Sequence, residues 1–103
     1  MAYELLISER ANYQIDKLAA YLLTVLNNRQ ACIHFFDELQ KTYEMLRTDP
    51  FCCKLCSEKL FAQKGYRSAQ LPTMRYRIIY RVEENKIYIV AVFHTLENYS
   101  RKL

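Results

Sequence analysis

Two alternating segments near the C-terminus, separated by one short break, constrain the fold most strongly. In residues 75–83 and 86–94, many side chains follow the period of two that is typical of β-strands. Only the dipeptide 84–85 lies between them, which is the length of a tight turn joining antiparallel strands. The two segments therefore predict a β-hairpin whose register is set by that turn.

The predicted register gives the hairpin two unlike faces. One face is apolar throughout, and its expected cross-strand pairs are Tyr76–Phe93, Ile78–Ala91, Tyr80–Ile89 and Val82–Ile87. The opposite face mixes basic and apolar groups, in the pairs Arg75–His94, Arg77–Val92, Ile79–Val90 and Arg81–Tyr88. A slip of one residue would mix the two sets, so the pattern specifies the register well. We expect the apolar face to pack on the core.

Two stretches with apolar residues at helical spacing precede the hairpin. The first follows Ser8, a residue type that caps helix N-termini, and extends to Leu26. The second begins after Asn28 and stops at residues 49–50, an Asp-Pro pair. Because the break between them is so short, the two helices are predicted to form an antiparallel hairpin.

The other segments complete a single α+β domain covering residues 1–103. Residues 3–7 form a short apolar run that predicts an opening strand, and residues 65–71 are compatible with another strand. Residues 51–64 are irregular in pattern and are expected to form a loop with at most one turn. The predicted order is β-α-α-β-β-β, with an N-terminal helix hairpin packed on one face of a small antiparallel-rich sheet.

Composition narrows the class of protein. The 103 residues are 51% hydrophobic, which is too apolar for a disordered chain, and no apolar run approaches the roughly 20 residues of a membrane span. The N-terminus carries no basic segment or cleavage site that would mark it for export, so we expect a cytoplasmic protein. The net charge of +4 is compatible with nucleic acid or an acidic protein partner and decides between neither.

The cysteine cluster Cys52-Cys53-x-x-Cys56 has part of the pattern of a metal site. Cys53 and Cys56 have the spacing of half a zinc site, but no second pair of ligands follows in the sequence. Adjacent Cys52 and Cys53 do not easily face one ion together with Cys56. We therefore expect no metal, no cofactor, and reduced thiols that pack the loop after the second helix.

At this point the sequence resembles a known superfamily. The segments Gly65-Tyr66-Arg67, 76–82 (YRIIYRV) and 87–94 (IYIVAVFH), in that order, resemble the C-terminal half of RelE/ParE-type toxins. The opening strand, the helix pair and Asp49-Pro50 fit the same pattern, so the resemblance covers nearly the whole chain. It implies the toxin component of a bacterial type II toxin–antitoxin (plasmid stabilization) system, which inhibits growth until a cognate antitoxin protein neutralises it.

The superfamily implies two targets. ParE-like members inhibit DNA gyrase, and RelE-like members act at the ribosome as metal-independent mRNA endoribonucleases. The segment Val92-Phe93-His94 is similar to ParE-like proteins and slightly favours gyrase inhibition, with mRNA cleavage as the alternative. A further alternative, from the nine tyrosines, is a non-toxic RNA-binding module, although Tyr76 and Tyr80 are expected in the core. No small-molecule ligand is expected.

If the chain is a nuclease, the resemblance suggests its site residues. The catalytic candidates are Arg67, Arg77 and His94, and the substrate-binding candidates are Lys64, Arg75, Arg81 and Tyr99. Ala69 departs from the pattern, because RelE-like nucleases carry a second basic residue there. Alternatively, the arginines form only a solvated sheet face and His94 simply ends a strand. The sequence leaves open the target, the antitoxin family, the oligomeric state and whether the protein is toxic.

Overall fold

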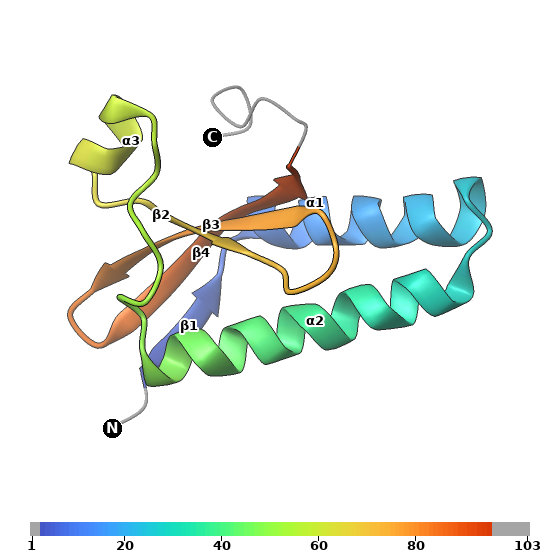
Figure 1. Ribbon diagram of the computed structural model, residues 1–103, viewed down its shortest axis with the longest axis horizontal. Helices are drawn as coiled ribbons and strands as arrows, with labels where there is room; N and C mark the ends of the chain where they lie inside the picture. The colour runs from blue at the N-terminus through green and yellow to red at the C-terminus, as the bar shows by residue number, and fades with distance from the viewer. Residues whose placement is uncertain (1–2, 96–103) are drawn as a thin grey trace.

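The computed structural model describes residues 3–95 (Figure 1). Its elements, in chain order, are β1 (Glu4–Ile7), α1 (Glu9–Ala20), the short π-helix η1 (Tyr21–Val25), α2 (Arg29–Thr48), α3 (Lys59–Gln63), β2 (Arg67–Gln70), β3 (Tyr76–Glu83) and β4 (Lys86–His94). The predicted order is confirmed, with α3 as an additional short helix inside the segment expected to be a loop. No helix within the described range is both long and apolar enough to cross a membrane.

The four strands form one mixed sheet with the order β1-β4-β3-β2. β1 runs parallel to β4, while the β4–β3 and β3–β2 pairs are antiparallel. The chain leaves β1, passes through the helix hairpin and returns to the sheet from its other edge, so α1 and α2 cover one face (Figure 1). This arrangement is the α+β fold that the sequence pattern predicted.

Both long helices begin at the capping residues expected from the sequence. The Ser8 hydroxyl accepts a hydrogen bond from the Ala11 amide at 3.0 Å, and the Asn28 side-chain oxygen accepts one from the Ala31 amide at 3.0 Å. The first helix ends in η1, where the Leu26 amide donates to the Tyr21 carbonyl in the wider i to i+5 pattern. Short π-helical turns of this kind are frequent at functional sites.

The main core lies between the helix hairpin and the sheet. Its buried members come from α1, η1, α2 and the inward face of the sheet, and include Ala11, Ile15, Leu22, Phe35, Leu39, Leu46, Ile78, Tyr80, Ile87, Ile89 and Val92. Tyr76 and Tyr80 belong to this core, as the alternation predicted. Full burial of side chains of this size contributes about 1.5–3 kcal/mol each.

The predicted hairpin register holds only near the turn. Glu84 adopts a positive φ of 56°, and the pairs Val82–Ile87, Arg81–Tyr88 and Tyr80–Ile89 are as expected. A β-bulge then shifts the ladder by one residue. Beyond it the observed pairs are Ile79–Ala91, Ile78–Val92, Arg77–Phe93 and Tyr76–His94, so the predicted pairs in this half were wrong.

The bulge has a physical cause in the N-terminal part of the chain. The Ser8 hydroxyl donates to the Val90 carbonyl at 3.4 Å, and the Gln14 side-chain oxygen accepts from the Val92 amide at 2.8 Å. The Val90 carbonyl and the Val92 amide lie close to the irregularity, and these contacts give them the hydrogen-bond partners that a regular ladder would have supplied. As a result Val92 faces the helices, while Ala91 and Phe93 face the other side of the sheet.

The second face of the sheet is covered as well. Ile79, Ala91 and Phe93 are buried there under Cys56, with Phe61 of α3 and Tyr66 packed against the cluster. The segment between α2 and β2 therefore covers part of the face that is predicted to mix basic and apolar groups. The left-handed turn that returns this segment to β2 uses Gly65, whose φ is 81°.

Candidate functional site

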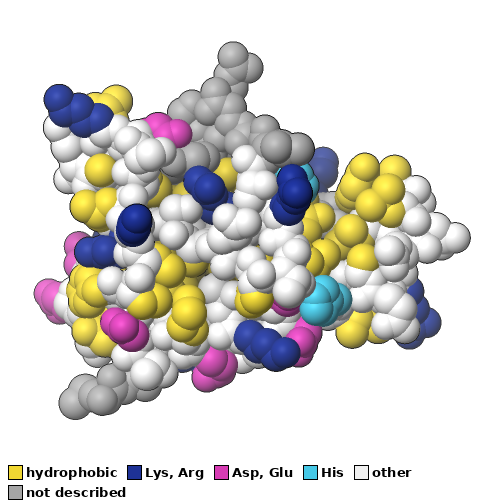
Figure 2. All heavy atoms as spheres, in the orientation of Figure 1, with side chains coloured by type: hydrophobic (Ala, Val, Ile, Leu, Met, Phe, Trp, Pro, Cys, Tyr) yellow, Lys and Arg dark blue, Asp and Glu magenta, His cyan; other side chains and the backbone are white. Residues whose placement is uncertain are grey.

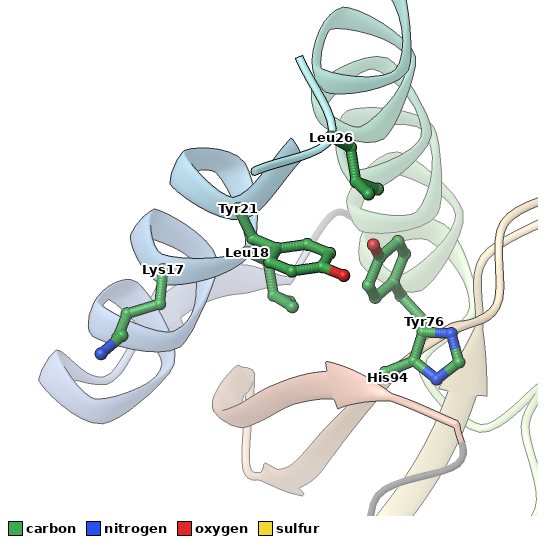
Figure 3. Close-up of a pocket in the computed structure, with 6 residues that line it drawn as sticks. All are labelled: Lys17, Leu18, Tyr21, Leu26, Tyr76 and His94. Carbon is green, nitrogen blue, oxygen red and sulfur yellow. The ribbon is translucent and has the colours of Figure 1, made fainter. Parts of the chain in front are cut away.

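A pocket of about 620 Å³ opens where the end of the first helix meets the end of the β3–β4 hairpin. Six residues line it, as Figure 3 shows: Lys17, Leu18, Tyr21, Leu26, Tyr76 and His94. They come from α1, η1, the interhelical turn and the two central strands. The pocket is therefore formed jointly by the helix layer and the sheet.

Two local irregularities shape this pocket. The π-helical turn η1 positions Tyr21 at its mouth while Leu22 remains in the core. The β-bulge places His94 on the helix-facing side, where its ring meets the Tyr76 ring edge-on at 5.4 Å between centroids. Without the extra residue in β4, the predicted register would place His94 on the opposite face.

The chemistry of the pocket favours binding of an apolar group. Leucine and tyrosine side chains form most of its wall, and Lys17 borders it with an ammonium group that points away from Tyr21, Tyr76 and His94 in Figure 3. The Lys17 ammonium lies 5.4 Å from the Tyr13 ring centroid, so it is held along the outer side of α1. Concave apolar surfaces with few polar groups are typical of binding sites.

Exposed apolar side chains lie at the end of the helix hairpin, beside the pocket. This hairpin-end surface consists of Tyr21, Leu23, Val25, Leu26 and Ile33, of which Val25 is the most exposed at 65%. Hydrophobic side chains gather over this end of the molecule in Figure 2. Clustered apolar exposure of this kind marks interaction surfaces.

Arg67, the first catalytic candidate, lies on the helix-facing side of the sheet. It pairs with Tyr80 across β2 and β3, and directly paired residues share a face. Its guanidinium donates to the Cys53 carbonyl at 2.7 Å and lies 5.0 Å from the Phe51 ring centroid. Arg67 therefore anchors the loop after α2.

The basic candidates on the hairpin take different positions. Arg77 and Arg81 lie on the face opposite the helices, as predicted. The Arg81 guanidinium stacks on Tyr88 at 4.3 Å and forms an ion pair with Glu83 at 3.3 Å. Arg75 is exposed just before β3, and its expected pairing with His94 was wrong because Tyr76 takes that place.

The three catalytic candidates are not brought together. Arg77 faces one side of the sheet, and Arg67 and His94 face the other. The β3 partners of Arg67 and His94 are four residues apart, or about 13 Å along the strand at 3.3 Å per residue. The expected acid–base and phosphate-binding constellation is therefore not formed by these side chains.

The two remaining substrate-binding candidates lie away from the pocket. Lys64 is exposed at the C-terminal end of α3, on the segment that covers the second face. Tyr99 lies outside the described residues. Within residues 3–95, no three potential metal-ligating side chains come together.

A buried carboxylate, which sequence reasoning missed, holds the loop between β2 and β3. Glu38 on α2 is 3% exposed and accepts hydrogen bonds from the backbone amides of Thr73 and Met74 at 3.1–3.2 Å and from the Thr73 hydroxyl. His34 Nε2 lies 3.1 Å from the same carboxylate. Burial alone would raise the pKa of Glu38, but these hydrogen bonds and His34 outweigh it and lower that pKa.

The sequence comparison identifies a family, and the structure comparison finds the same fold in solved proteins. Residues 5–99 match the family described as the ParE toxin of the type II toxin–antitoxin system parDE. A chain of the chromosomal ParDE system of P. aeruginosa is similar with a TM-score of 0.72 at 14% identity, covering 90% of this chain and 96% of that one. Comparison with curated proteins returned no similar sequence.

RelE-type structures share the same fold at lower TM-scores. The E. coli RelBE toxin–antitoxin complex is similar with a TM-score of 0.62 at 20% identity, covering 94% of this chain and all of that one. The RelBE2 complex of Mycobacterium tuberculosis gives 0.61 at 20% identity, with 91% and 99% covered. Because the family match spans nearly the whole described fold, the chain belongs to the ParE toxin family of type II toxin–antitoxin systems.

Proposed function

We propose that this toxin arrests growth by binding DNA gyrase, and that a cognate antitoxin neutralises it. The separation of Arg67, Arg77 and His94 carries the first half of the proposal. General acid–base catalysis needs its groups within hydrogen-bond reach of one substrate, and these three side chains lie on two faces of the sheet. Inhibition by binding requires no such constellation.

The anchoring of Arg67 supports the same conclusion. A guanidinium that binds the scissile phosphate must be free to approach it, whereas Arg67 is half-buried and donates to the Cys53 carbonyl. Breaking that contact would leave the carbonyl without a charged donor, which costs about 1.5–3 kcal/mol for a hydrogen bond to a charged group. Arg67 is therefore better suited to structure than to substrate binding.

The second half of the proposal assigns the antitoxin a binding surface. The RelE and RelBE2 relatives include toxin–antitoxin complexes, and this chain offers the pocket and the hairpin-end surface. An antitoxin segment with a bulky apolar side chain would fill the pocket, and a carboxylate lying along the outer side of α1 would meet Lys17. Ordering of such a segment consumes part of the binding energy, so a large apolar area is needed.

Induced expression tests the target. The chain is expressed with and without the product of the neighbouring reading frame, and plasmid supercoiling and protein synthesis are followed after induction. The proposal predicts that supercoiling falls before translation does, and that antitoxin prevents both effects. Rapid loss of translation with cleaved messenger RNA and normal supercoiling would instead support the RelE-like endoribonuclease.

A matched pair of variants tests the antitoxin surface. Leu26→Glu places a carboxylate in the apolar pocket and is expected to weaken antitoxin binding strongly. Substitutions at interface hot spots cost about 2 kcal/mol or more of binding free energy. Leu60→Glu introduces the same change on α3, where the side chain is also exposed, and serves as the control. Equal antitoxin affinity of both variants and the wild type, measured by calorimetry, would place the antitoxin elsewhere.

A further inference from the structure

Two adjacent thiols lie side by side on the loop that follows α2. The sulfur atoms of Cys52 and Cys53 are 3.7 Å apart, and neither residue forms a disulfide. Cys52 is exposed and Cys53 is half-buried against the core. A single atom with two bonds of about 2.3 Å to sulfur spans about 3.3 Å between the sulfurs at the nearly right angles of trivalent arsenic and about 3.8 Å at a tetrahedral angle. The pair therefore has the spacing of a bidentate dithiol.

The surrounding contacts hold this pair in place. The Cys53 carbonyl accepts from Arg67 at 2.7 Å, and the Cys52 amide donates to the Asp49 carbonyl at 3.2 Å. Tyr80 donates from its buried hydroxyl to the Pro50 carbonyl at 2.7 Å. A loop held by three hydrogen bonds loses little conformational entropy when its two thiols bind one ligand. Pre-organisation thus favours chelation.

We propose that Cys52 and Cys53 form a binding site for thiophilic electrophiles that accept two thiols at one atom, with monosubstituted trivalent arsenicals as the chemical class. In the reaction with an arsenoxide, two arsenic–sulfur bonds form and the arsenic–oxygen double bond breaks. The oxygen leaves as water with both thiol protons, and arsenic stays trivalent. No oxidant is needed.

The third cysteine of the cluster does not join the pair. Cys56 is buried on the opposite face of the sheet, beneath α3, with Ile79 and Phe93. The site is therefore limited to two thiols, which suits an arsenical that keeps one carbon substituent. This inference goes beyond the toxin function and does not depend on it.

Electrostatics favours this chemistry over binding of a divalent metal ion. Partial burial, the neighbouring Cys53 thiol and the Asp49 carboxylate raise the pKa of Cys52 to about 11, so the thiol is protonated near neutral pH. A metal ion binds thiolates and must displace that proton, which weakens its binding at neutral pH. Condensation with an arsenoxide consumes the protonated Cys52 thiol directly.

Phenylarsine oxide and the full-length chain provide the test. Native mass spectrometry should show one phenylarsenic adduct, which persists in excess glutathione and is removed by dithiothreitol. Cys52→Ser, at an exposed position, should weaken binding by roughly 10²- to 10⁴-fold because the second attachment is lost. Cys53→Ser should do the same.

The control variant is Cys56→Ser, which leaves the adjacent pair intact and should bind as the wild type does. Wild-type binding no tighter than that of Cys52→Ser, or release of the adduct by glutathione, would overturn the proposal. Loss of the adduct in Cys56→Ser would overturn it too, because the chelating pair would then be Cys53 with Cys56.

Discussion

Replacement of Glu38 should destabilise the protein more than replacement of an exposed glutamate on the same helix. The carboxylate accepts hydrogen bonds from two backbone amides and one hydroxyl of residues 73–74, and only 3% of the Glu38 surface is exposed. A hydrogen bond to a charged group contributes about 1.5–3 kcal/mol, and partly exposed Thr73 and Met74 regain some of this from water. We expect Glu38→Ala to cost about 3 kcal/mol.

Urea and thermal unfolding followed by circular dichroism measure this cost. A loss of about 3 kcal/mol corresponds to roughly 12–24 °C in the midpoint for a domain of this size. Glu44→Ala is the control, because that glutamate lies on the same helix but is exposed, and within residues 3–95 its carboxylate bonds only to Gln40 and Arg47. Solvent-exposed ion pairs contribute about 0–1 kcal/mol to the free energy of unfolding. A cost below about 1 kcal/mol for Glu38→Ala would refute the anchoring role.

The pH dependence gives a second signature of the same group. Because folding lowers the pKa of Glu38 below its usual 4.5, its contribution is fully present above that value and is lost as the pH falls through the folded-state pKa. Glu38→Gln cannot titrate there. The stability curves of the wild type and Glu38→Gln should therefore converge as the pH falls below about 4.5. A difference that stays constant to pH 2 would contradict the assignment.

Four further changes test side chains with buried or structural hydrogen-bonding groups. Tyr80→Phe removes the buried bond to Pro50 and should cost about 1–3 kcal/mol, whereas Tyr43→Phe should cost close to zero, since no partner of its buried hydroxyl is found in residues 3–95. Arg67→Ala should lower the unfolding midpoint, while an effect on toxicity alone would indicate substrate binding. Gln14→Ala should cost about 1 kcal/mol and shift the amide resonances of β4 around the bulge; unchanged resonances would remove its role there.

The sequence predicted those parts of the fold that depend on local pattern. Ser8 and Asn28 cap the helices that they are predicted to cap, and the two-residue turn sets the register of the first four pairs beyond it. The bulge was not predictable from the strands themselves. It depends on Ser8 and Gln14, which are 82 and 78 residues away from their β4 partners.

The candidate site was predicted less well for related reasons. One extra residue in β4 moves His94 to the helix-facing side, and the pairing of Arg67 with Tyr80 turns its side chain away from Arg77. Glu38 went unnoticed because a single acidic residue among apolar positions gives only a weak signal. Its proximity to Phe35 and Leu39 on the buried side of α2 is the one hint in the sequence.

Purified components test the central claim most directly. DNA gyrase, relaxed plasmid and ATP are incubated with increasing amounts of the purified chain, and the supercoiled product is measured with and without the antitoxin. We predict that the purified chain reduces supercoiling in a dose-dependent manner and that the antitoxin reverses this effect. The Arg77→Ala and His94→Ala variants should inhibit gyrase as the wild type does. Unimpaired gyrase, together with messenger RNA cut on ribosomes by the wild type but not by Arg77→Ala, would contradict the account.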